Sequence, residues 1–472
     1  MIMQDLGSLL DELKIPADFS RYENLDAPAV VVLDKWRENI SNVLEDIRRI
    51  CLSKDDAISS LETRRHTIVR IAPFLDQHQL TPDENDVIDS EEPWVNDRSR
   101  EIAREILTSE NVSLSDEEVA IHVLKDDIKP IFRTNPHPHL HTSTGRRIAK
   151  PAGGAMAMQD YYDSQPWKEH PGIYKVVLWC IHRIKPETYE RVWQLVIPPI
   201  MTFLDDYQAS YKLQGTLLVQ DLLRHVPADL LRRTGVDGLL QQSLRNSLAH
   251  LDNPDTPSLI EHAVQASLSL TLLTTTLGTG TNGSSKRFED LSFLLGEGII
   301  SGIWLYAEDK PQVVLATFRA LPNLLKALDI GGVRFLKALI PQLAHALIPR
   351  PLIDRNPAMQ TSAMFVLETL LDTCRPRIPP WKETILDAIG RCWVDLIDEG
   401  KKAPQVRAKV QQGRREVKVG LQRLCAKLAD VCPEILQEDM QRFMQADSLL
   451  FQDLFARARE KTKVEDEGAE DS

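Results

Sequence analysis

A turn that carries an acidic residue recurs through the second half of the chain, and this feature most constrains the fold. The acids lie 46, 57, 45 and 44 residues apart, at Asp206, Asp252, Asp309, Asp354 and Asp398, and a proline follows each of the last four, at Pro254, Pro311, Pro357 and Pro404. Proline suits the first helical position because its φ is already helical and no N–H is needed there. An acid near a helix start interacts favourably with the helix dipole. Each unit is therefore predicted to be a helix, a tight acidic turn and a second helix that begins at proline.

Apolar residues in this half recur every three or four positions, the spacing of one helix face. The clearest stripe comprises Val406, Val410, Val417, Leu421, Leu424, Leu428 and Val431. A single hairpin cannot bury such a stripe, whereas stacked hairpins can. A two-helix repeat of about 40–47 residues is typical of HEAT and armadillo proteins. We therefore expect an all-α fold, a right-handed α-solenoid of HEAT/armadillo-like hairpins over residues 171–460. Gly278–Ser285 lies inside the long spacing and is predicted to be an enlarged loop.

The first 130 residues are predicted to form an irregular helical region. Helices are expected at Pro28–Leu52, Ala57–Leu75, Arg98–Leu107 and Ser115–Ile128. Ser115 is a candidate N-cap because Glu118 follows three residues later. Residues 81–97 hold seven acids and no base, which predicts a mobile surface loop. Residues 131–170 are expected to connect this region to the repeats, and residues 461–472 to form a disordered acidic tail.

Charge is distributed unevenly along the 472 residues. The net charge of −13 comes from 69 acids and 56 bases, and residues 1–128 alone hold 29 acids against 14 bases. An acidic chain repels the phosphate backbone, so no nucleic-acid partner is expected. For the later residues, which are nearly neutral, that exclusion depends only on the lack of a recognisable nucleic-acid-binding motif.

Targeting and membrane signals are not apparent. Met1–Leu13 holds three acids and no base, which is the wrong charge for a leader. The longest uncharged run, Ala263–Ser285, contains Gln265 and breaks at Gly278, so we interpret it as a buried helix followed by a loop, with no membrane contact. The six cysteines form no C-x-x-C pair and are expected to be buried free thiols of a reducing compartment. A cytoplasmic and nuclear location follows.

No motif predicts catalysis. Gly278-x-Gly280-x-x-Gly283 matches a dinucleotide fingerprint only as a string, because a helix and not a strand is expected before it. His137-x-His139-x-His141 is the strongest metal candidate, but the prolines between the histidines and the lack of a partner motif favour a polar loop. Nucleophile, P-loop and kinase motifs are not found. We therefore expect no enzyme activity, no cofactor and no metal.

Two charged segments are candidate interaction sites. Lys401–Lys427 holds nine bases and one acid, and Arg407, Arg414 and Lys418 fall near one helix face. A solvated outer face is the plainer interpretation, and contact with an acidic partner is the alternative. In the acidic loop, Ser90 is a candidate phosphosite because a phosphate there would add a ligand for a basic pocket on a partner.

Two further stretches are more specific than the repeat. The first is Asp160-Tyr161-Tyr162-Asp163-Ser164-Gln165-Pro166-Trp167-Lys168, after Thr142-Ser143-Thr144-Gly145-Arg146-Arg147; the second is Pro198-Pro199-Ile200-Met201-Thr202-Phe203-Leu204-Asp205-Asp206-Tyr207, before Tyr211-Lys212-Leu213-Gln214-Gly215. Together with Trp179-Cys180 they resemble the family of the second Tel-two-interacting protein, the smaller Tti subunit of the TTT (Tel–Tti–Tti) complex. The resemblance is clear from about Pro136 to Leu223 and compatible with the later helices.

The residues of these stretches are predicted to be mainly structural. Asp205 and Asp206 would close a helix turn, with Lys212 reaching back toward their carboxylates as an ion-pair device. Gly215 would permit close helix packing. Tyr161 and Trp167 would cap the first repeat, since terminal repeats need a cap; direct contact with a partner is the alternative.

The resemblance implies a non-enzymatic scaffold subunit of a co-chaperone complex. Its direct partners would be the larger Tti subunit and the Tel-two subunit. The ninety-kilodalton heat-shock chaperone, its RuvB-like ATPase co-chaperone and the phosphatidylinositol-kinase-related kinases would be indirect partners. The C-terminal half, including Lys401–Lys427, is predicted to contact the larger Tti subunit. A transport or trafficking adaptor with a HEAT or armadillo solenoid is the alternative, and an enzyme with an unrecognised site is third.

Overall fold

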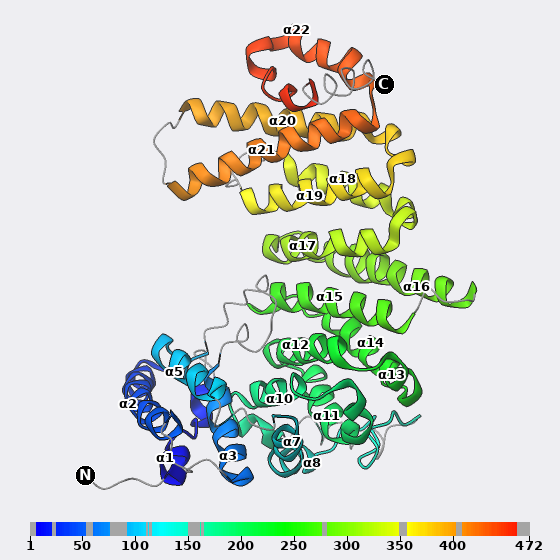
Figure 1. The fold of residues 1–472 in the computed structure, drawn as a ribbon. Helices are drawn as coiled ribbons and strands as arrows, with labels where there is room; N and C mark the ends of the chain where they lie inside the picture. Colours follow the sequence, from blue (N-terminus) through cyan, green and yellow to red (C-terminus); the bar gives the residue numbers. More distant parts are fainter. Residues whose placement is uncertain are drawn as a thin grey trace, which may run out of the picture. The chain divides into compact units, whose positions relative to one another are not determined.

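A computed structural model describes residues 6–20, 25–52, 60–75, 92–109, 112, 116–149, 161, 165–275, 281–348, 356–402 and 408–459 (Figure 1). Regular structure in these ranges is helical, and the one β-type pairing among them is an isolated bridge between Leu140 and Arg147. The predicted all-α class is confirmed.

The chain divides into two compact units. The first comprises Met1–Ser247 with Leu272–Thr274, and the second comprises Leu248–Thr271 with Thr275–Ser472. Residues 1–130 and 131–170, which the sequence distinguishes, therefore belong to the same compact unit as the first hairpins.

The first unit is built around a fully buried helix, α10 (Ile173–Ile181), which contacts α12, α7 and η4. Its other elements are α1 (Leu6–Glu12), η1 (Ala17–Ser20), α2 (Ala27–Leu52), α3 (Leu61–Ile71), η4 (Ala72–Phe74), α5 (Asp97–Thr108), α7 (Asp116–His122), η5 (Val123–Ile128), α8 (Lys129–Arg133), η6 (Pro166–Glu169), η7 (Pro186–Thr188), α11 (Tyr189–Leu204), α12 (Ala209–His225), α13 (Ala228–Thr234) and α14 (Val236–Ser247). The helices expected near α2, α3, α5 and α7 are all present, and the predicted cap Ser115 lies outside the described residues.

The acidic segment 81–97 is only in part what the sequence predicts. Residues 81–91 lie outside the described ranges, but Trp94 is buried and its indole N–H donates to the Pro73 carbonyl at 3.0 Å. Asn96 caps α5 by accepting from the Ser99 N–H at 2.7 Å. Glu92 pairs with the buried Lys175 of α10. The expectation of a surface loop is therefore wrong for residues 92–97, because apolar burial and a buried ion pair fix them to the core.

The second unit is a two-layer stack of helices (Figure 1). One layer is α17 (Pro311–Leu328), α19 (Pro357–Thr373) and α21 (Ala408–Val431), each in contact with the next, and the other contains α18 (Leu336–Leu347) against α20 (Lys382–Lys402). The remaining elements are α15 (Thr256–Thr274), α16 (Thr281–Phe293), η8 (Leu294–Trp304), η9 (Asp329–Phe335), η10 (Arg375–Arg377), η11 (Pro379–Trp381), η12 (Ile435–Asp439) and α22 (Met440–Phe451). Consecutive hairpins that stack in two layers are the arrangement of an α-solenoid.

The predicted helix starts are confirmed at two prolines. Pro311 begins α17, and Pro357 begins α19 after the N-cap Asn356, whose side chain accepts from the Met359 N–H at 3.1 Å. Pro254 is wrong as a helix start, because α15 begins at Thr256 and has Pro257 in its first turn. Asp354 and Pro404 lie outside the described residues.

The acidic turn predicted at Asp398 is also wrong. Asp398 lies inside α20, a helix of 21 residues. The helix continues through this point because Trp393 and Leu396, on its apolar face, are buried.

The loop at the glycine-rich insertion is shorter than the predicted Gly278–Ser285. Thr281–Ser285 forms the first turn of α16, so the loop prediction is wrong there, and Gly278–Gly280 lies outside the described residues. Helix α15 precedes it, so the strand that a dinucleotide fingerprint needs is replaced by a helix. Among the described helices, none is long and apolar enough to cross a membrane.

Candidate partner-binding site

The Gln-Pro-Trp-Lys part of the aromatic motif is fastened to the hairpin of α11 and α12. The Trp167 ring lies 4.5 Å from Phe203 of α11 and 4.8 Å from Tyr211 of α12, between ring centroids. Its indole N–H donates to the Gln165 side chain, whose amide donates to the Tyr161 carbonyl. Pro166 opens η6 with φ already fixed, which places Trp167 against the hairpin. The motif is therefore a clamp of aromatic and amide contacts.

Ionic contacts continue this clamp into the acidic turn. Lys168 Nζ lies 2.7 Å from Asp206 Oδ2 and 4.5 Å from the centre of the Tyr207 ring. The second carboxylate, Asp205, accepts from Nε2 of the buried His137 at 2.9 Å. Burial works to raise the pKa of Asp205, but hydrogen bonds from His137 and Ser243 and nearby positive charge hold it below its ordinary value. The two acids thus hold His137 and Lys168 at the C-terminal end of α11.

The expected Lys–Asp ladder takes a different form. Lys212 Nζ donates to the main-chain carbonyl of Leu204 at 2.8 Å, while the two carboxylates bind His137 and Lys168 instead. Burial lowers the pKa of Lys212, and the charges of Asp205 and Asp206 oppose this shift. The prediction for Gly215 is confirmed, because a Cβ atom there would lie 2.3 Å from the Leu204 nitrogen.

Burial decides between the two roles predicted for the aromatic residues. The side chains of Tyr161 and Trp167 are buried, so a structural role is favoured over direct contact with a partner. They do not end the stack of helices as a cap would, because α10 also contacts η4 and α7 of the N-terminal region. The first hairpin is therefore covered by the N-terminal helices, and the aromatic clamp lies at its side.

The three histidines do not act together. His137 binds Asp205, whereas the His141 ring lies 3.1 Å from the Ser143 hydroxyl. In the ranges that the structure describes, no three His, Cys, Asp or Glu side chains are grouped so as to hold a metal ion. All six cysteines are buried free thiols, as predicted, and burial raises the pKa of Cys51 to about 12.

The basic stretch at Lys401–Lys427 is largely neutralised within the unit. Arg414 pairs with Glu399 of α20 at 3.4 Å, and Lys418 pairs with Asp453 at 3.3 Å and lies over the Trp393 ring. Arg423 and Lys427 pair with acids of α19. Arg407, like Ser90, lies outside the described residues. Ion pairs within the second unit thus explain four of these bases, and the exposed Arg415 has no ion pair among the described side chains.

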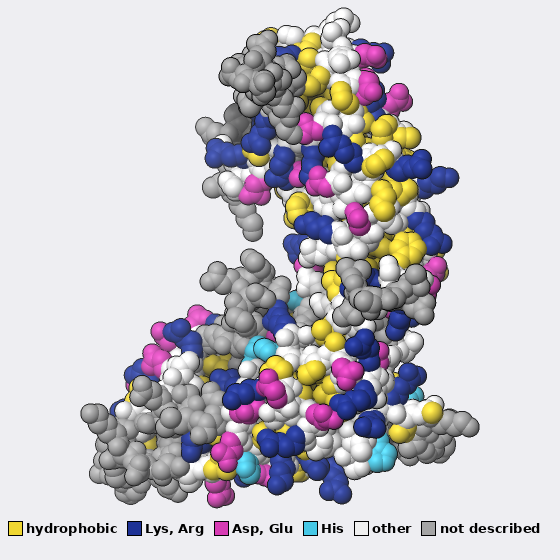
Figure 2. All heavy atoms as spheres, turned by 45° about the vertical axis from the view of Figure 1, so that its right-hand side comes forward, with side chains coloured by type: hydrophobic (Ala, Val, Ile, Leu, Met, Phe, Trp, Pro, Cys, Tyr) yellow, Lys and Arg dark blue, Asp and Glu magenta, His cyan; other side chains and the backbone are white. Residues whose placement is uncertain are grey.

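Exposed apolar side chains accompany Arg415 on the layer of α17, α19 and α21. Phe365 of α19 is 47% exposed, and Val419 of α21 is 36% exposed. Helix α19 contacts α17, α18 and α21, so Phe365 lies on its remaining, outer side. The upper part of Figure 2 shows hydrophobic side chains among Lys and Arg on one face of the second unit. We call Phe365, Arg415 and Val419 the outer α19–α21 surface.

The sequence did not identify this surface. The predicted stripe of α21 is buried at Val417, Leu421, Leu424 and Leu428, whereas Val410 at its N-terminal end is exposed. Val410 and Leu428 are five full helical turns apart and so lie on the same face, but Val410 lies in the first turn of α21, which begins at Ala408. Apolar residues that fall off the stripe, such as Val419, were the available signal.

Comparisons with known proteins agree with the motif. The model of the Tti2 family matches residues 86–355, more than half of the chain. Human TELO2-interacting protein 2 is 28% identical over 180 residues, which cover 38% of this chain and only 30% of that protein.

Two solved structures of the karyopherin Kap121p are similar in fold, one bound to Pho4p and one bound to the SUMO protease Ulp1p. The match to the first covers 92% of this chain and 37% of the karyopherin, and the match to the second covers 91% and 34%. Their sequence identities are 12% and 10%, and their TM-scores are 0.46 and 0.47. Likeness at this level supports no argument about function. The family match extends over the aromatic clamp, the acidic turn and the hairpin of α11 and α12, and the chain belongs to the Tti2 family.

Proposed function

We propose that the protein is a non-enzymatic scaffold subunit of the TTT co-chaperone complex. The match of residues 86–355 to the Tti2 family carries this proposal, and the name of the human relative, a TELO2-interacting protein, agrees with it. Its direct partners would be the larger Tti subunit and the Tel-two subunit. Through them it would support the maturation and stability of phosphatidylinositol-kinase-related kinases, in the cytoplasm and the nucleus.

We place the contact with the larger Tti subunit on the outer α19–α21 surface. Interface energy concentrates in a few apolar and Arg anchors that become fully desolvated. Phe365 and Val419 are exposed apolar side chains, and Arg415 is an exposed cation on the same helix as Val419. Arg414 and Lys418, the other candidate contact residues of this stretch, form ion pairs within the unit.

The test is co-purification from cells that express a tagged full-length chain. The triple variant Phe365→Ser, Arg415→Glu, Val419→Ser should lose most of the larger Tti subunit, at least about fivefold, because single anchors cost more than about 1 kcal/mol each. Leu449→Ser is the matched control, since Leu449 is an exposed apolar residue of α22 outside this surface.

The outcomes separate the complex from the contact surface. Undiminished recovery of the larger Tti subunit with the triple variant would contradict the placement on α19 and α21. Recovery of transport GTPases in place of TTT subunits with the unaltered chain would contradict the function itself.

A further inference from the structure

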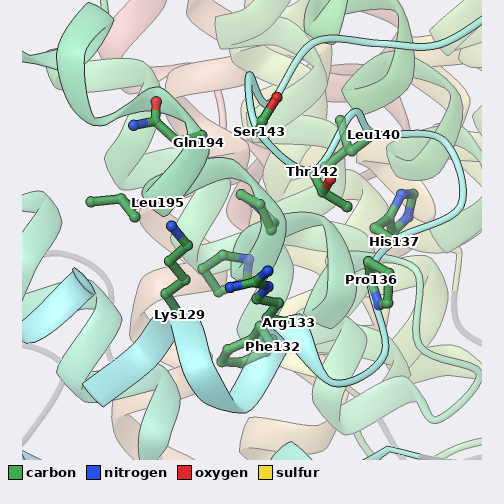
Figure 3. A pocket seen from close by; sticks show the side chains of 12 residues that line it. Lys129, Phe132, Arg133, Pro136, His137, Leu140, Thr142, Ser143, Gln194 and Leu195 are labelled. Atoms are coloured by element: carbon green, nitrogen blue, oxygen red, sulfur yellow. The ribbon is translucent and has the colours of Figure 1, made fainter. Parts of the chain in front are cut away.

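A pocket of about 180 Å³ opens on the first unit, between α8, residues 136–143 and the middle of α11 (Figure 3). Its apolar lining comes from Phe132, Leu140, Leu195 and Pro198. Pockets for drug-sized ligands are about 300–1,000 Å³, whereas a cavity of about 150 Å³ holds benzene. The pocket therefore has room for one apolar side chain and not for a nucleotide.

Two cations face this space. Lys129 and Arg133 lie four residues apart on α8, hence on one face of the helix, and both side chains extend toward the space between Leu195 and Thr142 (Figure 3). Neither makes a hydrogen bond or ion pair with another described side chain. Like charges at this spacing destabilise a helix. A bound anion would relieve the repulsion between Lys129 and Arg133. The paired bases of α21 differ because their ion pairs already neutralise them.

The backbone of α11 adds acceptors to the same pocket. Pro198 and Pro199 stand inside the helix and have no N–H, so the carbonyls of Gln194 and Leu195 lose their regular helical donors. Both residues line the pocket. Exposed hydroxyls of Thr142 and Ser143 stand at its rim. An extended peptide supplies main-chain N–H groups that match such acceptors.

We propose that this pocket binds an acidic peptide segment of a protein partner. One apolar side chain of the peptide fills the floor beside Phe132 and Leu140. Carboxylates on either side of it pair with Lys129 and Arg133, and its main chain donates to the freed carbonyls of α11. An inorganic anion would use only the two cations, and a nucleotide is too large for a pocket of about 180 Å³.

The inference does not depend on the proposed contact with the larger Tti subunit. The pocket belongs to the first unit and shares no residue with the outer α19–α21 surface. Loss of peptide binding and loss of the larger subunit can therefore be measured in the same variants as separate outcomes.

Fluorescence anisotropy of labelled peptides against the full chain tests the proposal. The probe is a peptide of about nine Asp and Glu residues with a central Leu, compared with a central-Ser peptide and with a central-Leu peptide whose acids are Gln and Asn. We expect the first to bind at least about tenfold more tightly than either other, since both the anchor and the charges contribute. Arg133→Glu should weaken binding about tenfold or more.

Two further variants keep the test independent of folding. Lys125→Glu makes the same kind of change on the preceding helical turn, outside the pocket, and should leave binding unchanged. Thr142→Trp, at an exposed rim position, should block the pocket without removing a charge.

Several results would overturn the proposal. These are undetectable binding of the central-Leu peptide, equal effects of Arg133→Glu and Lys125→Glu, or equal binding of the central-Ser peptide. Equally effective displacement by a single-stranded oligonucleotide of the same charge would show a general polyanion site. Recovery of the larger Tti subunit should be normal in Arg133→Glu throughout.

Discussion

Gly215 sets the distance between α11 and α12 at the scale of a single residue. A Cβ atom at this position would lie 2.3 Å from the Leu204 nitrogen, 2.5 Å from the Leu204 Cα and 2.6 Å from the Phe203 carbonyl carbon. These are backbone atoms, so no side-chain movement can make room. The hairpin that carries the aromatic clamp therefore requires glycine here.

We expect Gly215→Ala to destabilise the first unit by about 3 kcal/mol, because overpacking forces the backbones apart. Gly400→Ala is the matched control. Gly400 lies in α20 with nothing within 4 Å of an added Cβ, so alanine should stabilise the helix by about 0.5–1 kcal/mol. Urea unfolding followed by circular dichroism measures both changes. Equal stability of Gly215→Ala and the unaltered chain would show that α11 and α12 are free to separate.

Asp127 gives the first unit a pH dependence. Its Oδ2 atom lies 3.4 Å from Arg65 Nε, and burial raises the pKa of its carboxyl to about 6 although the Arg65 charge opposes the shift. The unfolded value is about 3.9. Because the pKa is higher in the folded state, ionisation of Asp127 destabilises the folded protein. This destabilisation is absent below about pH 4, where the carboxyl is protonated in both states, and is complete once the pH has risen through 6.

Asp127→Asn should therefore stabilise the protein more at about pH 7.5 than at about pH 4.5. The difference should be about 1 kcal/mol, reduced from the full shift because the carboxylate is only partly buried. Thermal unfolding of both proteins at the two pH values measures it. A gain that is the same at both values would show that burial does not shift this carboxyl.

Sequence reasoning identified Gly215 and the acidic turn but not their partners. The Lys-x-x-Gly spacing is local, so the role of the glycine followed from it. The partner of Asp205 is His137, 68 residues earlier, and that of Asp206 is Lys168. Each pair joins residues that are distant in the sequence, and no local pattern contains that information.

The element η6 is held by its aromatic side chain more than by its own hydrogen bonds. It is four residues long, too short to be stable alone. Trp167 nevertheless lies in contact with Phe203 and Tyr211, and Lys168 stands over the Tyr211 ring at 4.9 Å. Tertiary packing thus gives this short element its place.

Trp167→Ala should cost about 3–5 kcal/mol, the usual price of removing a buried large aromatic side chain. Trp167→Phe should recover part of this loss, because a ring remains against Phe203 while the N–H bond to Gln165 is gone. Urea unfolding measures both variants. Tyr306→Ala, which removes an exposed aromatic side chain, should change stability by no more than about 0.5 kcal/mol.

At the element scale, proline and apolar periodicity predicted α17 and α19 because the signals for both are local. The turn at Asp398 was wrong because an acid on the solvated face of a long helix looks the same as an acid in a turn. Helix α16 replaced part of a loop because Thr281–Ser285, although polar, continues through Lys286–Phe293 into the apolar run of η8. The structure at Asp398 and at Thr281–Ser285 was therefore decided by residues beyond the local sequence pattern.

Across the whole molecule, charge separates two modes of binding. Four bases of α21 are paired with acids of the same unit, so the outer α19–α21 surface offers mainly apolar anchors. The pocket beside α8 instead offers two cations without an ion pair among the described side chains. Exposed charges are screened over about 8–10 Å at moderate salt, and apolar contacts are not.

Raising sodium chloride from about 50 to about 300 mM should therefore affect the two contacts differently. Binding of the larger Tti subunit should weaken by less than about threefold, whereas the affinity for the acidic peptide should fall about tenfold. Anisotropy of the peptide and co-purification of the subunit over the same salt series measure both. A salt-sensitive subunit contact would mean that Arg414, Lys418 and their neighbours exchange their internal acids for acids of the partner, and charge reversal at these bases would then weaken the complex more than loss of Phe365.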